Sequence, residues 1–171
     1  MAQHEPWNAD RATAIVAAVQ VSHGGATTGV GVAEAARQTA MLPILHALQT
    51  AFGCVPVQAE PLIAAQLNVS RADVHGAVSF YHDFRRSPPG RHVLRLCRAE
   101  ACQSVGADTV AHTIRTTLGV DWHDTSADGA VTLEPVFCLG LCASGPAALV
   151  DGQPVGRLTA QGARDLLQAL P

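Results

Sequence analysis

Charged and aromatic side chains are both scarce in this sequence. Of its 171 residues, 15% are Asp, Glu, Lys or Arg and 4% are Phe, Trp or Tyr, whereas 48% are hydrophobic. The net charge is −3 and no basic tract is present, which argues against nucleic acid as a partner. No apolar run is long enough to cross a bilayer, so we expect a soluble protein that does not span a membrane.

An export signal is also missing from residues 1–7, which contain neither a basic stretch nor a long apolar stretch. The five cysteines are therefore expected in a reducing compartment, and we predict a cytoplasmic protein. The chain is long enough to build a hydrophobic core without covalent cross-links, so a disulfide framework has no evident role.

The usual catalytic and nucleotide-binding patterns are absent as well. The sequence shows no Ser/His/Asp array and no paired carboxylates, and we predict no catalytic residue in this chain. Residues 24–31 are rich in glycine, but they lack the Gly-Lys-Ser/Thr ending of a phosphate-binding loop, and no predicted strand precedes them. We interpret them as a flexible linker whose role is open.

The strongest candidates for a functional site are instead four cysteines that form two pairs. Cys97 and Cys102 make the first pair, and Cys138 and Cys142 make the second. Each pair follows an apolar run that is typical of a β-strand. Two strand ends that each present two thiols can close one four-thiolate site.

Three interpretations of these cysteines are open: an iron–sulfur cluster, a zinc ion, and buried or unpaired thiols. Four thiolates are the ordinary ligand set of a two-iron or four-iron cluster. Structural zinc sites more often use cysteine pairs with the tighter spacing of fingers and ribbons. Residues 138–143 carry no charge and include Gly140, whose backbone can approach inorganic sulfide closely. The pattern favours the cluster, with a zinc-stabilised interaction module as an alternative.

The fold is predicted to be α+β, with a helical bundle in residues 1–86 and an α/β domain in residues 91–171. Pro88, Pro89 and Gly90 mark the boundary, since paired prolines and a glycine favour a rigid turn. Helices are expected over residues 8–21, 32–51 (divided at Pro43), 60–67, 70–81, 105–118 and 159–170. Strands are expected over residues 91–97, 119–125, 130–137 and 147–150, with a short extended piece at 154–156.

A few other side chains also have expected roles. Cys54 is interpreted as a small buried hydrophobe, with a reactive thiol or a fifth ligand as the alternative. His92 is expected at the surface. Arg98 and Glu100 lie within the first cysteine pair, where they form either a solvated loop or a docking contact for a partner. The aromatic run 80–84 is interpreted as a packing joint between two domains.

The cysteine motifs resemble a known family. Residues 97–103 with Gly106, and residues 134–142, are similar to the motifs of the thioredoxin-like [2Fe–2S] ferredoxins and of the small iron–sulfur subunit of respiratory complex I. Together with residues 42–49 and 74–85, they resemble the gamma subunit of soluble NAD-dependent, molybdenum-containing formate dehydrogenases. The resemblance runs from about residue 42 to the C-terminus.

This resemblance implies a thioredoxin-like second domain that carries one [2Fe–2S] cluster. Cys97 and Cys102 would bind one iron, and Cys138 and Cys142 the other. The implied function is electron transfer, with formate oxidation and NAD reduction on partner chains. The implied partners are a flavin- and NAD-binding iron–sulfur subunit, in direct contact with the helical bundle, and a molybdenum catalytic subunit. The alternative is the equivalent subunit of complex I or of an NAD-linked hydrogenase.

Overall fold

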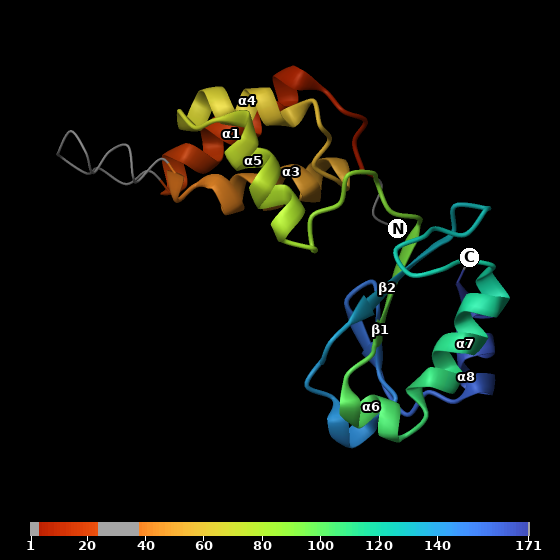
Figure 1. The fold of residues 1–171 in the computed structure, drawn as a ribbon. Coiled ribbons are helices and arrows are strands. Elements are labelled where there is room, and N and C mark those ends of the chain that lie inside the picture. The colour runs from red at the N-terminus through yellow and green to blue at the C-terminus, as the bar shows by residue number, and fades with distance from the viewer. Residues whose placement is uncertain (1–3, 24–37, 171) are drawn as a thin grey trace. The chain divides into compact units, whose positions relative to one another are not determined.

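The computed structural model describes residues 4–23 and 38–170, which fall into two compact units that divide between Pro88 and Pro89 (Figure 1). The first unit is helical, and the second combines helices with a four-stranded sheet. The glycine-rich segment 24–31 and the first part of the predicted helix 32–51 lie outside the described residues. Within the described ranges, no helix is both long enough and apolar enough to cross a membrane.

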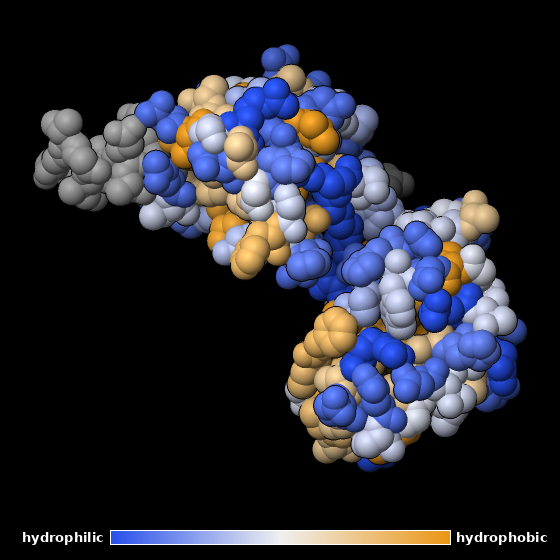
Figure 2. Space-filling model, viewed as in Figure 1, coloured by the Kyte–Doolittle hydropathy of each residue, from blue (hydrophilic) through white to orange (hydrophobic). Residues whose placement is uncertain are grey.

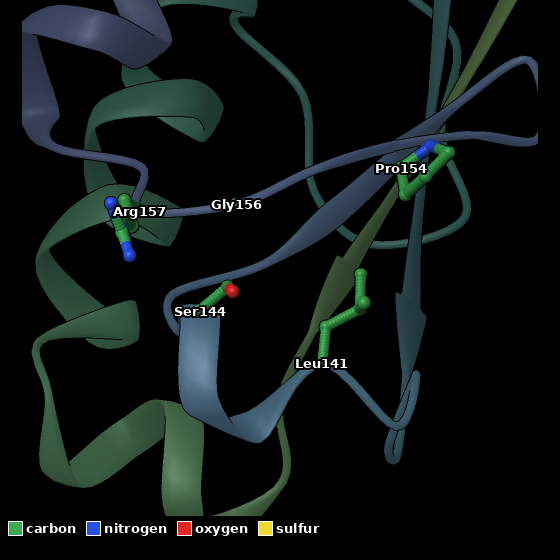
Figure 3. A pocket seen from close by; sticks show the side chains of 5 residues that line it. All are labelled: Leu141, Ser144, Pro154, Gly156 and Arg157. Carbon is green, nitrogen blue, oxygen red and sulfur yellow. The ribbon is translucent and has the colours of Figure 1, made fainter.

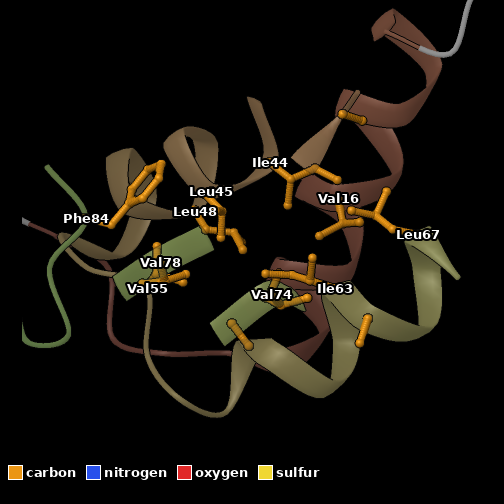
Figure 4. Close-up of a cluster of buried hydrophobic side chains, with 14 of the residues drawn as sticks. Val16, Ile44, Leu45, Leu48, Val55, Ile63, Leu67, Val74, Val78 and Phe84 are labelled. Carbon is orange, nitrogen blue, oxygen red and sulfur yellow. The ribbon is translucent and has the colours of Figure 1, made fainter. Parts of the chain in front are cut away.

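The helical unit contains α1 (Ala9–His23), α3 (Met41–Phe52), α4 (Ala59–Leu67) and α5 (Arg71–Phe80). Apolar side chains recur along these helices at helical spacing and pack into one core (Figure 4). The largest fully buried members of this core are Val16, Ile44, Leu45, Leu48, Val55, Ile63, Leu67 and Val74. The helices predicted over 8–21, 60–67 and 70–81 are confirmed.

Local hydrogen bonds fix several ends of these helices. The Asn8 side-chain oxygen accepts from the Arg11 N–H at 2.8 Å and caps α1. Ser70 and Asp73 form a capping box at the start of α5, in which each backbone N–H donates to the other residue's side chain. Gly53 ends α3 with φ +74°, a left-handed conformation that costs glycine little.

Pro43 does not divide a helix, contrary to the sequence prediction. The chain turns at Thr39 and Ala40, and α3 begins at Met41, so Pro43 lies in the first turn of α3. The first N–H groups of a helix have no partner inside it, and a proline there removes no hydrogen bond.

The α/β unit is built on strands β1 (His92–Cys97), β2 (Val131–Val136), β3 (Ala148–Val150) and β4 (Gln153–Val155), in the order β2-β1-β3-β4. β1 and β2 are parallel, with His92 opposite Val131 and Cys97 opposite Val136. β3 pairs antiparallel with both β1 and β4. Parallel neighbours need a crossover, which the helical connection between β1 and β2 supplies.

Three helices complete this unit: the short α6 (Glu100–Ser104), α7 (Ala107–Leu118) and α8 (Ala160–Ala169). Figure 1 shows α7 and α8 side by side against the sheet, and their apolar faces close its core. The Thr159 hydroxyl accepts from the Gly162 N–H at 3.0 Å and caps α8, as the sequence predicts. The buried residues of this core include Leu94, Leu96, Val110, Ile114, Leu133 and Ala163.

The strand predicted over residues 119–125 is absent from the structure, and the prediction is wrong. Only an isolated bridge joins Thr125 to Thr132. His123 has φ +69°, which breaks an extended backbone, and its N–H donates to the Leu133 oxygen from an irregular turn. The crossover from β1 therefore leads directly to β2, and the sheet keeps its parallel pair next to the cysteine loops.

Candidate iron–sulfur site

The two cysteine pairs meet at one edge of the sheet. β1 and β2 run parallel and in register, so the loops that follow them start side by side. Cys97 is the last residue of β1, and Cys102 lies in α6 just beyond it. Cys138 follows β2 after one intervening residue, and Cys142 opens the 3-10 helix η1 (Cys142–Ser144).

Burial divides the four thiols into two kinds. Cys97 and Cys102 are each 2% exposed and pack with Ala107 and Ala147 in a small cluster of their own. Cys138 and Cys142 are exposed. All five cysteines of the chain are free thiols, so no disulfide competes for the pairs. One side of the site is therefore enclosed by protein, and the other opens to the surface.

Hydrogen bonds join the thiols within each pair. The Cys102 thiol donates to the Cys97 sulfur, and the Cys142 thiol donates to the Cys138 sulfur. Burial, and then this donation, raise the pKa of Cys102. Donation to Cys138, and the charge on that sulfur, raise the pKa of Cys142. The two thiols of each pair therefore lie close enough to influence each other's pKa.

The two pairs are also in contact with each other. Burial would raise the pKa of the Cys97 thiol, but hydrogen bonds from the Ala99 amide, the Cys102 thiol and the amides of Cys138 and Leu139 outweigh it, and the pKa is lowered. The amides of the second loop therefore point at the first pair. Amide N–H groups in this position stabilise sulfur in its thiolate form.

Backbone contacts hold the sulfurs in place. The Cys97 N–H donates to the Ala147 oxygen at 2.9 Å, which ties the end of β1 to the segment before β3. Cys138 has φ +104°, a conformation that is uncommon outside glycine and occurs preferentially at functional sites. The Gly140 N–H donates to the Cys138 sulfur at 3.3 Å. The loop after β2 thus folds back on the Cys138 sulfur.

These residues fit a two-iron cluster. Each iron of such a cluster would take two thiolates, so the cluster needs two neighbouring pairs of cysteines. A single metal ion would instead need four groups around one point. When bound, a [2Fe–2S] cluster accepts and donates one electron at a time.

Arg98, between the two cysteines of the first pair, is not a solvated loop residue. Its guanidinium lies 2.7 Å from the Asp108 carboxylate and 5.3 Å from the centre of the Trp122 ring. The charge is therefore neutralised within the unit, whereas Glu100 is exposed. Neither the short helix α6 nor the role of Trp122 was predicted, because five helical residues leave no periodic signal and Trp122 meets Arg98 only in the folded chain.

Two other sequence predictions have different outcomes. Cys54 is buried at 5% exposure in the helical unit, and burial raises the pKa of its thiol, which confirms it as a buried residue. His92 is not at the surface: it is 8% exposed, and its Nδ1 lies 2.7 Å from the Asp151 carboxylate. Asp151 also accepts from the Val93 N–H at 2.8 Å, so this contact ties the β3–β4 turn to β1.

The chain is similar to known proteins in both sequence and fold. The family model for the thioredoxin-like [2Fe–2S] ferredoxins matches residues 31–171. An NADH-quinone oxidoreductase subunit of Pseudomonas aeruginosa is 36% identical over 132 residues, which cover 77% of this chain and 80% of that protein. The HndA subunit of the NADP-reducing hydrogenase of Solidesulfovibrio fructosivorans is 33% identical over 119 residues, or 70% of each chain.

Among solved structures, an NAD⁺-reducing [NiFe]-hydrogenase in its H2-reduced state is similar in fold, with a TM-score of 0.63 and 24% identity. The match covers 74% of this chain but only 22% of the hydrogenase chain. Fold and site define an iron–sulfur protein of thioredoxin-like architecture. The chain belongs to the thioredoxin-like [2Fe–2S] ferredoxin family, whose cofactor is a [2Fe–2S] cluster. The predicted fold class and cofactor are confirmed.

Proposed function

We propose that Cys97, Cys102, Cys138 and Cys142 hold one [2Fe–2S] cluster and that the chain is an electron-transfer subunit of an NAD-linked oxidoreductase complex. The observation that carries the proposal is the meeting of two thiol pairs at one sheet edge, one pair buried and the other exposed. A buried pair anchors a cofactor, and an exposed pair brings it near the surface, where electrons pass between proteins. No site for bond-making chemistry was recognised in the sequence.

Each thiol pair would bind one iron. The order of the elements supports this division, because Cys97 and Cys102 lie together at the end of β1 and Cys138 and Cys142 lie together after β2. The amides of Cys138 and Leu139 that face Cys97 would donate to sulfur, which with solvent exclusion sets the reduction potential.

The test is direct. The protein is purified without oxygen, its iron and acid-labile sulfide are quantified, and visible and EPR spectra are recorded before and after dithionite. We expect about two irons and two sulfides per chain and a paramagnetic signal after reduction. A colourless protein that contains about one zinc per chain would instead identify a zinc-stabilised interaction module.

For the complex itself, we propose the gamma subunit of an NAD-dependent, molybdenum-containing formate dehydrogenase. Residues 42–49 and 74–85 support this branch by resemblance. The partners would be a flavin- and NAD-binding subunit, in direct contact, and a molybdenum subunit in the same complex. Free thiols throughout the chain suit the reducing cytoplasm. The relatives from an NADH-quinone oxidoreductase and from an NADP-reducing hydrogenase support the alternative complexes equally well.

The branch is decided by the native complex. The chain is tagged in its source cell and isolated with its co-purifying subunits, and NAD⁺ reduction is measured with formate or with H2 as the electron donor. Formate-dependent reduction, together with molybdenum in the preparation, supports the proposal. Reduction by H2 identifies a hydrogenase, and NADH oxidation by quinone identifies respiratory complex I.

A further inference from the structure

Few charged residues accompany the paired cysteines along the chain. Residues 96–106 and 136–150 contain all four of these cysteines, but only two charged residues, Arg98 and Glu100. Figure 2 shows apolar residues gathered along the side of the α/β unit where these segments lie. A charge in apolar surroundings acts over a longer distance than a charge in water. Arg98, which directly follows the buried Cys97, is therefore the charged residue with the greatest influence on this site.

Hydrogen bonds fix the backbone of Arg98 on both sides. Its N–H donates to the Val136 oxygen at 2.7 Å, which ties the loop after β1 to the end of β2. Its carbonyl oxygen accepts from the Gln103 side-chain amide at 2.6 Å, which ties it to α6, the helix that carries Cys102. The side chain of Arg98 therefore leaves the backbone from a fixed point next to Cys97.

The guanidinium of Arg98 is also held in place. It lies 2.7 Å from the Asp108 carboxylate, in the first turn of α7, and 5.3 Å from the centre of the Trp122 ring. A cation over an aromatic ring is attracted to the ring face, and this attraction adds to the ion pair. Contacts from two different segments thus hold the positive charge in one position relative to Cys97.

The two charges of this ion pair differ in exposure. The Arg98 side chain is 24% exposed, whereas the Asp108 side chain is 64% exposed. Water and salt screen an exposed charge more strongly than a half-buried one. The pair has no net charge, but Arg98 is the less screened partner and the neighbour of Cys97 in the chain. We therefore expect the positive charge to dominate the electric field at the first cysteine pair.

We propose that Arg98 raises the reduction potential of the cluster and that Asp108, as its counter-ion, moderates this effect. Reduction adds one electron and makes the site one unit more negative, so a positive charge held beside it favours the reduced form. The inference rests on the proposed function, because it concerns the cluster that the four cysteines would hold. Neither residue supplies a ligand, and each acts on the cluster through its charge.

The experiment measures the midpoint potential of the full-length holoprotein by EPR during titration with dithionite. Arg98→Gln removes the cation. We expect the equilibrium constant for reduction to fall about three- to tenfold, which lowers the potential by about 30–60 mV at about 59 mV per tenfold. Asp108→Asn leaves the cation without its counter-ion and should raise the same constant about two- to threefold. Both variants break one ion pair, so a purely structural role would move both potentials in the same direction.

Two other arginines serve as matched controls. Arg115 lies 5.8 Å from the centre of the same Trp122 ring and 2.8 Å from Asp121, but it is about 10 Å further along α7 than the first turn. Arg157 is exposed and lines a pocket of about 330 Å³ together with Leu141 of the loop after β2 (Figure 3). Because Arg115 is distant and Arg157 is exposed, Arg115→Gln and Arg157→Gln should each change the constant by less than about twofold.

A conservative variant separates charge from shape. Arg98→Lys keeps the positive charge without the planar guanidinium and should stay within about twofold of the wild-type constant. A fall as large as that of Arg98→Gln would overturn the inference, because the charge is still present. If Arg98→Gln does not fold, the rise expected for Asp108→Asn, at an exposed carboxylate, decides the question alone.

The remaining outcomes are equally distinct. An unchanged potential in Arg98→Gln, shifts of the same sign in Arg98→Gln and Asp108→Asn, or an equal shift in Arg115→Gln would each overturn the inference. Iron and sulfide content identify which proposal has failed. Wild-type protein without a cluster overturns the proposed function itself, whereas wild-type protein that holds its cluster, with variants that do not shift as expected, overturns only the role of Arg98.

Discussion

A buried carboxylate in the helical unit allows a quantitative test of the structure. The Glu60 side chain is 4% exposed and lies 2.8 Å from the Arg86 guanidinium and 2.9 Å from His75 Nδ1. Arg71 lies 3.9 Å away and is 63% exposed. Arg86 is only 33% exposed, so its pair with Glu60 is the one most withdrawn from water.

The cost of removing each partner follows from this burial. Removing one partner of a fully buried ion pair costs about 3–5 kcal/mol, because the other charge stays buried without compensation. After Arg86→Ala, His75 and Arg71 still face Glu60, so we expect a smaller loss of about 2–3 kcal/mol. Arg71→Ala removes a longer, exposed pair and should cost less than about 0.5 kcal/mol.

The assay follows hydrogen exchange of α4 and α5 peptides in increasing urea, because the two units of the chain need not unfold together. Glu60→Gln, Arg86→Ala and the double variant close a cycle that isolates their coupling. We expect a coupling of about 1–2 kcal/mol, since the double variant leaves no buried charge. Coupling near zero, or equal losses for Arg86→Ala and Arg71→Ala, would refute the ion-pair geometry.

The same carboxylate predicts a pH dependence. Burial would raise the pKa of Glu60, but hydrogen bonds and charges from His75 and Arg86 outweigh it and hold the pKa below its ordinary value of 4.5. A carboxyl whose pKa is lower in the folded state stabilises the fold above its unfolded pKa, and this contribution disappears as pH falls through the folded pKa. The stability difference between wild type and Glu60→Gln should therefore shrink as the pH falls below about 4.5.

Three further predictions concern single substitutions in the two units. Cys142→Ser should lose iron and sulfide, while Cys54→Ser should keep both, as measured by metal analysis and EPR; loss of the cluster in Cys54→Ser would show that the ligand assignment is wrong. Gly156→Ala should lower stability by about 1–3 kcal/mol, because its Cβ would meet Ser144 atoms at 2.8 and 2.9 Å. Gly76→Ala, inside α5 with nothing within 4 Å of the new Cβ, should raise stability by about 0.5–1 kcal/mol in thermal unfolding.

The sequence predicts well where the two cysteine pairs lie in the sheet, because the relevant signals are local. Apolar runs bounded by turn residues identify β1 and β2 to within a residue at each end. The ends of these strands meet because they are parallel, and the long connection between them, with its helix, favours that arrangement. The cap residues Asn8, Ser70 and Thr159 are equally local, since each accepts a hydrogen bond from within its own first turn.

The missing strand over residues 119–125 shows where local signals mislead. Val120 and Trp122 alternate with polar residues and imitate the period of a strand. In the structure Trp122 instead contacts Arg98 and Arg115, which belong to other parts of the chain, and His123 adopts a left-handed backbone. Contacts that form only in the folded chain therefore outweigh the short alternation of apolar and polar residues in this segment.

The difference in burial between the two cysteine pairs could not be predicted for the same reason. All four thiols look alike in sequence, and their burial depends on what packs over them. Cys97 and Cys102 are covered because Ala107 and Ala147 are small enough to pack against them, whereas the second loop has no such cover. Arg157 reaches that loop only because the β3–β4 hairpin returns the chain to it. The exposed thiols and the backbone of Arg157 thus come together only in the folded chain.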